Sequence, residues 1–383
     1  MKNFEYYNPT KIIFGKDTIK KINKLIPQDK RVLITYGAGS IKRNGVYDQV
    51  IDALGNREVF EFGSIEPNPH FETCMECVKF IKENNIDFIL AVGGGSVIDA
   101  TKFIAAAFFH ENDAWEIINS NIKIEKALPF GSVLTLPATG SEMNSGAVIT
   151  RKETKDKRSF HSELCFPQFS ILDPLVTISL SEKQVSNGIA DTFVHVMEQY
   201  LTFPVNNQIS DRFSESILLT LIEEAPKVFA NPNDYDVRAN LMWAATLGLN
   251  GLIACGSPQD WATHMIGHEL TAFFGLDHGV TLSIVLPGVM KVMRDEKSEK
   301  ILQYGERVFG IKDGQREDRI TKAIEMTEEF FNSINIPTRL SQVNLNEKDI
   351  DTIVQRMIER KWSLGENGTI NPEKVRLILT DRL

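Results

Sequence analysis

The first 180 residues consist of short apolar runs that end in glycine and alternate with helical stretches. Residues 31–36 (RVLITY) lead into GAGS, residues 87–92 (DFILAV) lead into GGGSVIDATKFIAAAFF, and further apolar runs occupy residues 130–142 and 169–180. Continuous apolar runs of about four to six residues are typical of strands buried on both faces. Because such runs alternate with helical patterns, they predict a mostly parallel sheet with right-handed crossovers.

The pattern changes after Leu180. Residues 181–184 (SEKQ) have the S-x-x-Q form of a capping box and predict a helix through VSNGIADTFVHVMEQYL. Long helical patterns follow at residues 211–229, 237–253, 319–334 and 347–360, and no strand pair is predicted among them. The sequence therefore predicts an α/β domain over residues 1–180 and a helical domain over residues 181–383.

Size and composition agree with two domains and exclude some partners. A chain of 383 residues exceeds what one hydrophobic core usually supports. A net charge of −9 argues against nucleic-acid binding, which needs clustered Lys and Arg. No run is apolar enough for a membrane span, and the first residues lack the apolar stretch of a secretory signal. Four cysteines are too few for a disulfide framework, so we expect a cytoplasmic protein with reduced thiols.

Two glycine turns are candidate nucleotide-binding loops. Gly93, Gly94 and Gly95 come directly after a predicted strand and before a helix, where backbone amides and the helix dipole favour an anion. The usual G-x-G-x-x-G fingerprint is absent. The second turn, residues 37–40 (GAGS), lacks the carboxylate that typically accepts from the ribose of NAD. This favours NADP, with the nearby cations of residues 42–43 either facing its phosphate or simply solvated.

Acidic and histidine side chains at helical spacing suggest a metal site. Asp191 and His195 stand at i and i+4 in one predicted helix, and His264 and His268 stand in the same relation in another. The second helix is expected to begin with Ser257 as its N-cap and Pro258 in its first turn. Oxygen from Asp and nitrogen from His suit a borderline divalent ion such as zinc or ferrous iron.

Spacing leaves open whether His264 or His268 is a ligand, and it constrains His278. A helix continuing to Phe274 would carry the chain about 15 Å past His264. The next four residues span at most roughly 14 Å. If His264 and His278 share an ion, we therefore expect the helix to bend or end well before Gly275.

Taken together, the motifs resemble those of the iron-containing (group III) alcohol dehydrogenase family, over essentially the whole chain. GGGSVIDATK, LPATGSE, GIADTFVHVMEQYLT, PQDWATHMIGHEL and LDHG appear in the family's order. The similarity is greatest to its NADPH-dependent butanol dehydrogenases and broad-specificity aldehyde reductases. The resemblance implies a Rossmann-like N-terminal domain and an all-helical C-terminal domain (the dehydroquinate synthase-like fold), usually in a homodimer.

The resemblance also implies roles for individual residues. The metal ligands would be Asp191, His195, His264 and His278, whereas His268 would line the nicotinamide pocket and is the candidate catalytic proton relay. The residues that match nucleotide-contacting positions or turns are Gly37, Gly39, Ser40, Asn68, Gly94, Gly95, Ser96, Asp99, Thr139, Ser141 and Lys157. Gly37 falls where NAD-using relatives carry Asp, which is similar to the NADP-preferring branch.

These features predict a metal-dependent, NADP(H)-dependent alcohol dehydrogenase or aldehyde reductase (class 1.1.1) acting on small to medium primary alcohols and aldehydes such as butanol and butanal. The cofactors would be NADP(H) and one Fe²⁺ or Zn²⁺ ion. The first alternative is a polyol dehydrogenase of the same fold, acting on glycerol or propanediol. The second is a non-catalytic nucleotide or metal sensor.

Overall fold

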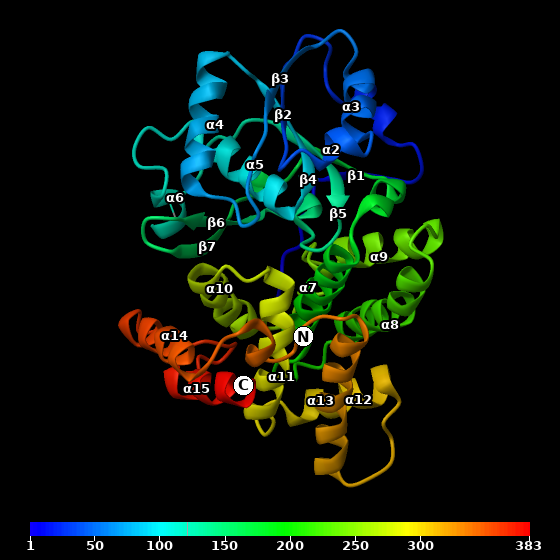
Figure 1. Cartoon of the computed structure of the whole chain (residues 1–383), viewed down its shortest axis with the longest axis vertical. Helices are drawn as coiled ribbons and strands as arrows, with labels where there is room; N and C mark the ends of the chain where they lie inside the picture. Colours follow the sequence, from blue (N-terminus) through cyan, green and yellow to red (C-terminus); the bar gives the residue numbers. More distant parts are fainter. Residues whose placement is uncertain (121) are drawn as a thin grey trace. The chain divides into compact units, whose positions relative to one another are not determined.

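The computed structural model describes residues 1–120 and 122–383, which divide into two compact units (Figure 1). The α/β unit comprises Tyr7–Leu180 and Pro232–Thr246. The helical unit comprises Met1–Tyr6, Ser181–Asn231 and Leu247–Leu383. One boundary of this division falls directly after Leu180, and two short segments lie with the other unit.

A six-stranded sheet in which all neighbours are parallel forms the centre of the α/β unit (Figure 1). In sheet order the strands are β1 (Lys11–Phe14), β8 (Phe169–Leu172), β5 (Phe130–Leu136), β4 (Phe88–Gly94), β2 (Arg31–Thr35) and β3 (Glu58–Phe62). The predicted parallel sheet is confirmed. The chain moves outward from β2 to β3 and then returns to the other side of β2 with β4, so the strand order reverses between β2 and β4. Such a switch point is where parallel sheets bind ligands, at the carboxyl ends of the strands.

The apolar strands are buried on both faces. Leu33, Ile89 and Ala91 belong to a core layer shared with α4 (Phe71–Glu83) and α5 (Gly95–Ala107). The alternate residues of β2 and β4 (Val32, Ile34, Leu90 and Val92) belong to a second layer, shared with α1 (Ile22–Leu25) and α3 (Val46–Leu54). Burial on both sides explains why these strands are continuously hydrophobic and not alternating.

The remaining elements of the α/β unit are short. They are η1 (Ile19–Lys21), α2 (Ser40–Arg43), α6 (Glu116–Asn119), η2 (Ser141–Met143), η3 (Glu163–Cys165) and η4 (Pro174–Ser179). The last predicted apolar run, residues 169–180, is only partly a strand, because Asp173 accepts a hydrogen bond from the backbone of Leu175 and starts η4. An antiparallel hairpin of β6 (Gly146–Arg151) and β7 (Asp156–His161), which the pattern did not predict, lies outside the main sheet.

Part of α9 (Tyr235–Gly248) completes the core of the α/β unit. Met242 is fully buried in the layer that contains α4 and α5. The Thr246 hydroxyl donates a 2.6 Å hydrogen bond to Oε1 of Glu142, a buried carboxyl. Burial raises the pKa of Glu142, although the hydrogen bond from this hydroxyl favours the charged carboxylate.

Cys74 and Cys77, which form a C-x-x-C stretch, lie on the buried face of α4. Cys74 and Cys77 are free thiols with almost no exposure. Burial raises the pKa of each thiol, which lowers the fraction present as reactive thiolate. They therefore act as small apolar side chains in the core.

The helical unit is built around α7 (Glu182–Tyr200), which is almost entirely buried from Gly188 onward. Its remaining helices are α8 (Gln208–Ala230), α10 (Ala262–Phe274), α11 (His278–Val292), α12 (Ser298–Phe309), α13 (Arg316–Ser333), η5 (Leu340–Val343), α14 (Glu347–Glu359) and α15 (Pro372–Asp381). The predicted capping box is confirmed: Ser181 Oγ accepts from the Gln184 amide, and Gln184 Oε1 accepts from the Ser181 amide. The cap fixes where α7 begins and therefore which residues face α8, α10 and α11.

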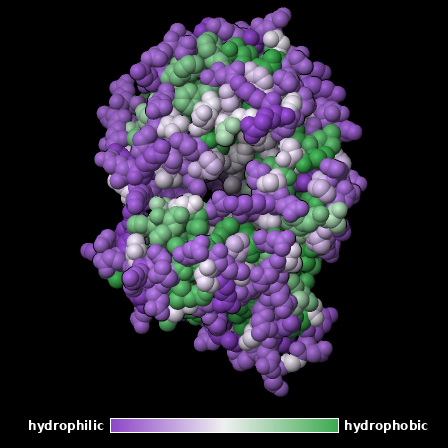
Figure 2. All heavy atoms as spheres, viewed as in Figure 1, coloured by the Kyte–Doolittle hydropathy of each residue, from purple (hydrophilic) through white to green (hydrophobic). Residues whose placement is uncertain are grey.

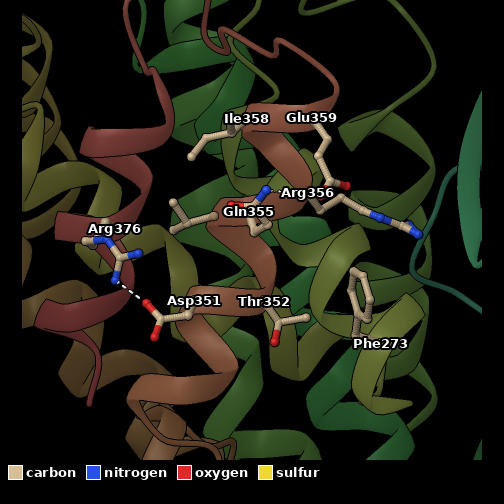
Figure 3. A pocket seen from close by; sticks show the side chains of 9 residues that line it. Phe273, Asp351, Thr352, Gln355, Arg356, Ile358, Glu359 and Arg376 are labelled. Carbon is tan, nitrogen blue, oxygen red and sulfur yellow. Dashed lines mark hydrogen bonds and ion pairs between the residues drawn. The ribbon is translucent and has the colours of Figure 1, made fainter.

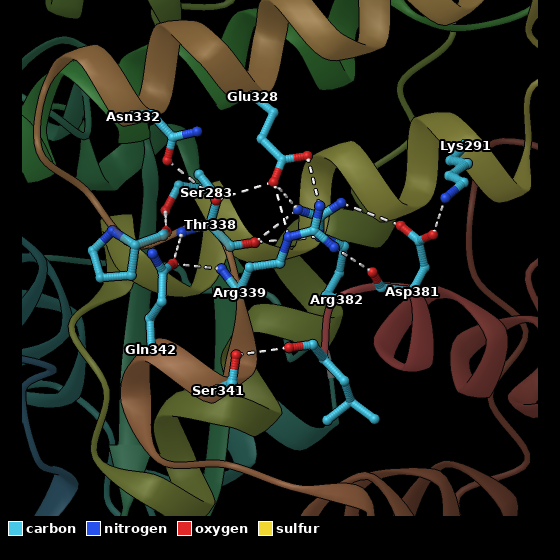
Figure 4. A network of polar contacts seen from close by, with 12 residues as sticks. Ser283, Lys291, Glu328, Asn332, Thr338, Arg339, Ser341, Gln342, Asp381 and Arg382 are labelled. Atoms are coloured by element: carbon cyan, nitrogen blue, oxygen red, sulfur yellow. Dashed lines mark hydrogen bonds and ion pairs between the residues drawn. The ribbon is translucent and has the colours of Figure 1, made fainter.

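A network of polar contacts holds the last residues of the chain (Figure 4). The Arg382 guanidinium, 2% exposed, donates to Glu328 Oε1 at 2.5 Å and to the Thr338 carbonyl at 2.9 Å. Arg339 donates to the same carboxylate at 3.0 Å and to the Asp381 carbonyl at 2.9 Å. Two guanidinium groups on one carboxylate connect α13 to the end of α15.

A buried lysine between two carboxylates predicts a pH effect on stability. Lys297 Nζ lies 2.7 Å from Asp260 Oδ2 and 2.9 Å from Glu366 Oε2. Burial and the hydrogen bond to Asp260 raise the pKa of Glu366 to about 7, although Lys297 opposes the shift. Between the ordinary carboxyl pKa and pH 7, Glu366 is protonated in the folded chain but ionised in the unfolded chain. Its contribution to the free energy of unfolding is therefore lost as the pH rises toward 7.

We expect the Glu366→Gln variant to escape this loss. The difference between the unfolding midpoints of the variant and the wild type should be more favourable to the variant at about pH 8 than at about pH 5, because the amide cannot ionise. Thermal unfolding followed by circular dichroism at both pH values tests this. The exposed Glu347→Gln variant in α14 is the control. A difference between Glu366→Gln and the wild type that does not depend on pH would contradict the prediction.

No helix in the part of the chain that the structure describes is long and apolar enough to cross a membrane. The displayed face carries polar side chains over much of its area, with apolar ones in separate patches (Figure 2).

Candidate functional site

The turn from β4 to α5 forms a close-packed glycine loop at the ligand-binding edge of the sheet. Gly94 is the last residue of β4, and Gly95 is the first of α5. A Cβ atom at Gly95 would lie 2.4–2.9 Å from side-chain atoms of Thr139, and one at Gly93 would overlap Val97. Glycine is therefore required at these positions, because the Thr139 and Val97 side chains occupy the space that a Cβ would need.

Polar side chains connect this loop to the neighbouring segments. The backbone N–H of Asn68 donates to Ser96 Oγ at 3.3 Å, and Lys157 Nζ donates to the side-chain Oδ1 of Asn68 at 2.8 Å. Ser141 Oγ donates to Asp99 Oδ1 at 2.5 Å, and the Asp99 carboxylate also accepts from the Val148 amide at 2.8 Å.

The structure thus brings most of the predicted nucleotide-binding residues together. The glycine loop with α5, the turn after β5, the hairpin and the segment before α4 contribute to one connected group. Its members are Asn68, Gly94, Gly95, Ser96, Asp99, Thr139, Ser141 and Lys157.

The second glycine turn follows β2, the strand beside β4. Gly39 adopts a left-handed conformation (φ +82) directly before Ser40 begins α2. A Cβ at Gly37 would lie 3.9 Å from Val97 of α5, so this turn adjoins the glycine loop. Gly37, Gly39 and Ser40 therefore also lie at the switch point of the sheet.

Lys42 is exposed but has partners. Its Nζ lies 2.6 Å from Glu61 Oε2, 5.0 Å from the ring centre of Tyr36 and 4.7 Å from that of Tyr47. The hydroxyls of both tyrosines donate to the same carboxylate. The Lys42 ammonium group is therefore held beside the Gly37 turn by an ion pair and two aromatic rings.

In the helical unit, three imidazoles converge on one carboxylate oxygen. Asp191 and His195 lie one turn apart on α7 and are buried, with exposed fractions of 3% and 4%. Asp191 Oδ1 lies 3.4 Å from Nε2 of His195, 3.7 Å from Nε2 of His264 and 3.6 Å from Nε2 of His278. Such spacings between atoms are those expected of ligands arranged around one ion.

His264 lies on α10 and His278 is the first residue of α11. The expectation that α10 bends or ends well before Gly275 is wrong, since the helix continues unbroken to Phe274. The rings of His264 and His278 are nevertheless only 5.2 Å apart. The chain reverses at Gly275 (φ +69), α11 packs back along α10, and the length of the two side chains, which the backbone estimate omitted, closes the remaining gap.

The predicted start of α10 is also wrong. The helix begins at Ala262, not after Ser257, and its N-cap, Trp261, has a left-handed conformation (φ +63) that is rare for a bulky residue. Two side chains cap its first amides: Asp260 Oδ1, just before the helix, accepts from Ala262 at 2.7 Å, and Glu198 Oε1 of α7 accepts from Thr263 at 2.5 Å. Sequence spacing missed these caps because one of them comes from a different helix.

The donor set fits a divalent cation. Asp191, His195 and His264 offer one ligand atom each, all within 4.8 Å of one another. His264 Nε2 is buried and makes no hydrogen bond to any described residue. Burial disfavours a charged imidazole, but Glu198 and Asp191 outweigh it, so the pKa of His264 is raised to about 9. A bound cation would replace the proton that these carboxylates hold there.

His268 lies beside this cluster, one turn after His264 on α10, and is 6% exposed. Its ring centre is 6.3 Å from that of His264 and 5.5 Å from that of His278. The group of ligand atoms that all lie within 4.8 Å of one another contains neither His268 nor His278, although His278 Nε2 lies 3.6 Å from Asp191 Oδ1.

Two residues near the cluster were not predicted as site residues. Glu198 contacts Nδ1 of His264 through its Oε2 atom, and Trp261 presents its ring edge-on to His264 at 5.2 Å and to His195 at 6.2 Å. The signal for Glu198 was present in the sequence, because it follows His195 by three residues and so lies on the same face of α7. Nothing in the sequence indicates the unusual backbone of Trp261.

A separate hollow of about 630 Å³ lies in the helical unit beside α14 (Figure 3). Its lining includes Phe273, Thr352, Gln355 and Arg356, and Arg376 forms an ion pair with Asp351 at its side. Its charged side chains are balanced, and no cluster of metal-binding groups lies within its described lining.

The Rossmann-like sheet and the carboxylate–histidine cluster of the helical unit define a metal-dependent dehydrogenase. Comparison with known proteins then gives the family. Residues 9–174 match the family model described as iron-containing alcohol dehydrogenase, and residues 185–383 match that of the C-terminal part of the Fe-containing alcohol dehydrogenase family. The chain belongs to the iron-containing alcohol dehydrogenase family.

Relatives resemble the chain over its full length. It is 54% identical to the NADPH-dependent aldehyde reductase YqhD of Escherichia coli, covering 99% of each chain. It is 42% identical to the probable NADH-dependent butanol dehydrogenase 1 of Bacillus subtilis, again over 99% of each. Among solved structures, that of YqhD from Escherichia coli K-12 matches with a TM-score of 0.98 and 52% identity, covering 100% of this chain and 99% of that one. The NADH-dependent butanol dehydrogenase A of Thermotoga maritima matches with a TM-score of 0.96 and 37% identity, over 100% and 99%.

Proposed function

We propose that the protein transfers a hydride between NADP(H) and small to medium primary alcohols or aldehydes, such as butanol and butanal. The observation that carries the proposal is the convergence of three imidazole Nε2 atoms on Asp191 Oδ1, at 3.4–3.7 Å. The names of relatives that are NADPH-dependent aldehyde reductases or butanol dehydrogenases support it.

In this proposal Asp191, His195, His264 and His278 hold one Fe²⁺ or Zn²⁺ ion. The substrate oxygen would then bind the ion as a ligand in addition to these four side chains. The ion, when bound, supplies Lewis acidity that polarises an aldehyde carbonyl or lowers the pKa of an alcohol. The His278 side chain is 23% exposed, against 5% for Asp191, so it marks the side from which substrate would reach the cluster.

The nucleotide would be held by the α/β unit. Gly94, Gly95 and Ser96 lie at the start of α5, where backbone amides and the helix dipole favour an anion, so they are assigned to the pyrophosphate. Gly37, Gly39 and Ser40 are assigned to the ribose phosphate of NADP(H), beside the Lys42 cation. Asn68, Asp99, Thr139, Ser141 and Lys157 are assigned to shaping the rest of the cradle through the hydrogen bonds that connect them.

We assign His268 to handling the proton. It is buried next to His278, and an imidazole exchanges protons near neutral pH. Its role would be to hold or pass the proton that the alcohol gains or loses, while hydride moves to or from the nicotinamide.

Removal of metal tests the proposal. We expect protein dialysed against a strong chelator to lose at least about 90% of its NADPH-dependent butanal reductase activity, because the Lewis acidity of the ion is lost. Activity should return with stoichiometric Fe²⁺ or Zn²⁺, measured as NADPH absorbance loss on metal-quantified protein. Full activity in metal-free protein would contradict the mechanism.

A substrate panel separates the alternatives. Initial rates for C2 to C8 aldehydes and alcohols, glycerol and propanediol, with NADPH and with NADH, should favour butanal and NADPH. Higher kcat/KM for the polyols would favour a polyol dehydrogenase. Absence of turnover with every substrate would favour a nucleotide or metal sensor.

We further propose that the enzyme works as a homodimer in the cytoplasm. The resemblance to the family supports the dimer, and the four free cysteines fit a reducing compartment. Sedimentation velocity of the purified protein tests the first point, and cell fractionation tests the second.

A further inference from the structure

Glu198 contacts both the imidazole of His264 and the backbone at the start of α10. Its side chain is 3% exposed and lies on α7, two helical turns after Asp191. The two oxygens of its carboxylate do different things: Oε1 accepts from the Thr263 amide at 2.5 Å, and Oε2 contacts Nδ1 of His264. No lysine or arginine among the described residues forms an ion pair with it.

The imidazole of His264 therefore lies between two carboxylates of the same helix. Nδ1 faces Glu198, and Nε2 lies 3.7 Å from Asp191 Oδ1. A carboxylate accepts hydrogen bonds and cannot donate, so Glu198 keeps a proton on Nδ1. In the neutral ring this leaves the lone pair on Nε2, the atom that points toward Asp191.

We propose that Glu198 is a positioning residue that sets the tautomer and orientation of His264 for metal binding. This inference rests on the proposed metal site but concerns a residue outside the ligand set. The charge of Glu198, added to that of Asp191, balances a divalent cation when the imidazoles are neutral. The N-terminus of α10 stabilises the Glu198 charge in its buried position.

Replacement by glutamine separates this role from simple packing. The amide has one accepting oxygen, while Thr263 N–H and His264 Nδ1–H both need an acceptor. If the oxygen stays with Thr263, the amide NH₂ faces Nδ1 and favours a proton on Nε2, which blocks ligation. We expect Zn²⁺ affinity of Glu198→Gln to fall about 10–100-fold, the size of effect typical of partners behind a metal-binding histidine.

The experiment measures Zn²⁺ dissociation constants by competition with a chromogenic chelator, on full-length apoprotein. Glu215→Gln is the matched control, because Glu215 is equally buried in the helical unit but contacts Tyr200 and Arg307. Glu215→Gln should bind Zn²⁺ as the wild type does, and Glu198→Asp should recover part of the lost affinity. Equal affinities for wild type and Glu198→Gln would overturn the proposal.

A second measurement does not depend on metal binding or on folding of the variant. Nitrogen-15 NMR of the histidines in the wild-type apoprotein, at a pH above the titration of His264, should show its proton on Nδ1. Glu198→Gln, where folded, should shift it toward Nε2. A wild-type proton on Nε2 would overturn the role of Glu198 even if the protein binds metal. If the proton is on Nδ1 but the wild type binds no metal, the proposed metal function fails and the tautomer assignment stands.

Discussion

Replacing Asp191 by asparagine is expected to lower kcat/KM for butanal and NADPH at least about 1,000-fold. The variant keeps the shape of the side chain but removes the charge on which three imidazoles converge. Loss of about 4 kcal/mol of transition-state stabilisation corresponds to this factor, and it is the size expected when a catalytic ion is no longer held. Initial rates together with metal content by mass spectrometry test the prediction.

Glu182→Gln provides the control for this experiment, because Glu182 is an exposed carboxylate in the first turn of the same helix. It should keep both metal and activity. An Asp191→Asn variant that binds a full equivalent of metal and turns over at half the wild-type rate would show that this oxygen does not hold the ion.

Replacing Gly37 by aspartate is expected to reverse the coenzyme preference. A carboxylate there would repel the phosphate on the ribose of NADPH and accept from the hydroxyl of NADH. We expect kcat/KM for NADPH to fall about 100-fold, which is roughly 2.7 kcal/mol. The structure has room for the change: a Cβ at Gly37 meets only the Ile65 carbonyl at 3.4 Å and Val97 at 3.9 Å, and the backbone there is not left-handed.

Gly37→Asn separates charge from size in this prediction. The asparagine variant adds almost the same volume without the charge, so it should retain most of the preference for NADPH. If both variants lose NADPH equally, size and not charge is responsible. If Gly37→Asp still prefers NADPH, Gly37 does not face the ribose phosphate.

The architecture was predictable where one kind of burial dominates the sequence. The strands β2, β4 and β5 are apolar on both faces and end at glycine or a turn, so both the strands and their ends are visible in the sequence. The capping box of Ser181 is a local signal and was read correctly. The β6–β7 hairpin was missed because it lies outside the main sheet, and its strands follow one another too closely for the helix-and-strand alternation on which the prediction relied.

Residue spacing predicted that Asp191 and His195 lie together, but it did not predict the geometry of the candidate site. Asp191 and His195 share a helix face, which spacing alone shows, whereas the approach of His278 depends on how α11 packs against α10. The start of α10 was misplaced because Ser257 and Pro258 form a typical local signal, while the actual caps are Asp260 and a side chain from α7. Contacts between helices far apart in the chain leave no periodic trace in the sequence.

The contribution of α9 to the α/β unit has a consequence for biosynthesis. Met242 and Thr246 complete that unit's core and partner Glu142, yet the ribosome makes them only after two long helices of the other unit. The sheet therefore emerges without the α9 residues that pack into its core, and part of its apolar surface stays uncovered until residues 232–246 have left the exit tunnel. A truncated polypeptide ending at residue 180 should consequently aggregate or recruit chaperones, whereas one extended through residue 246 has every piece of that core.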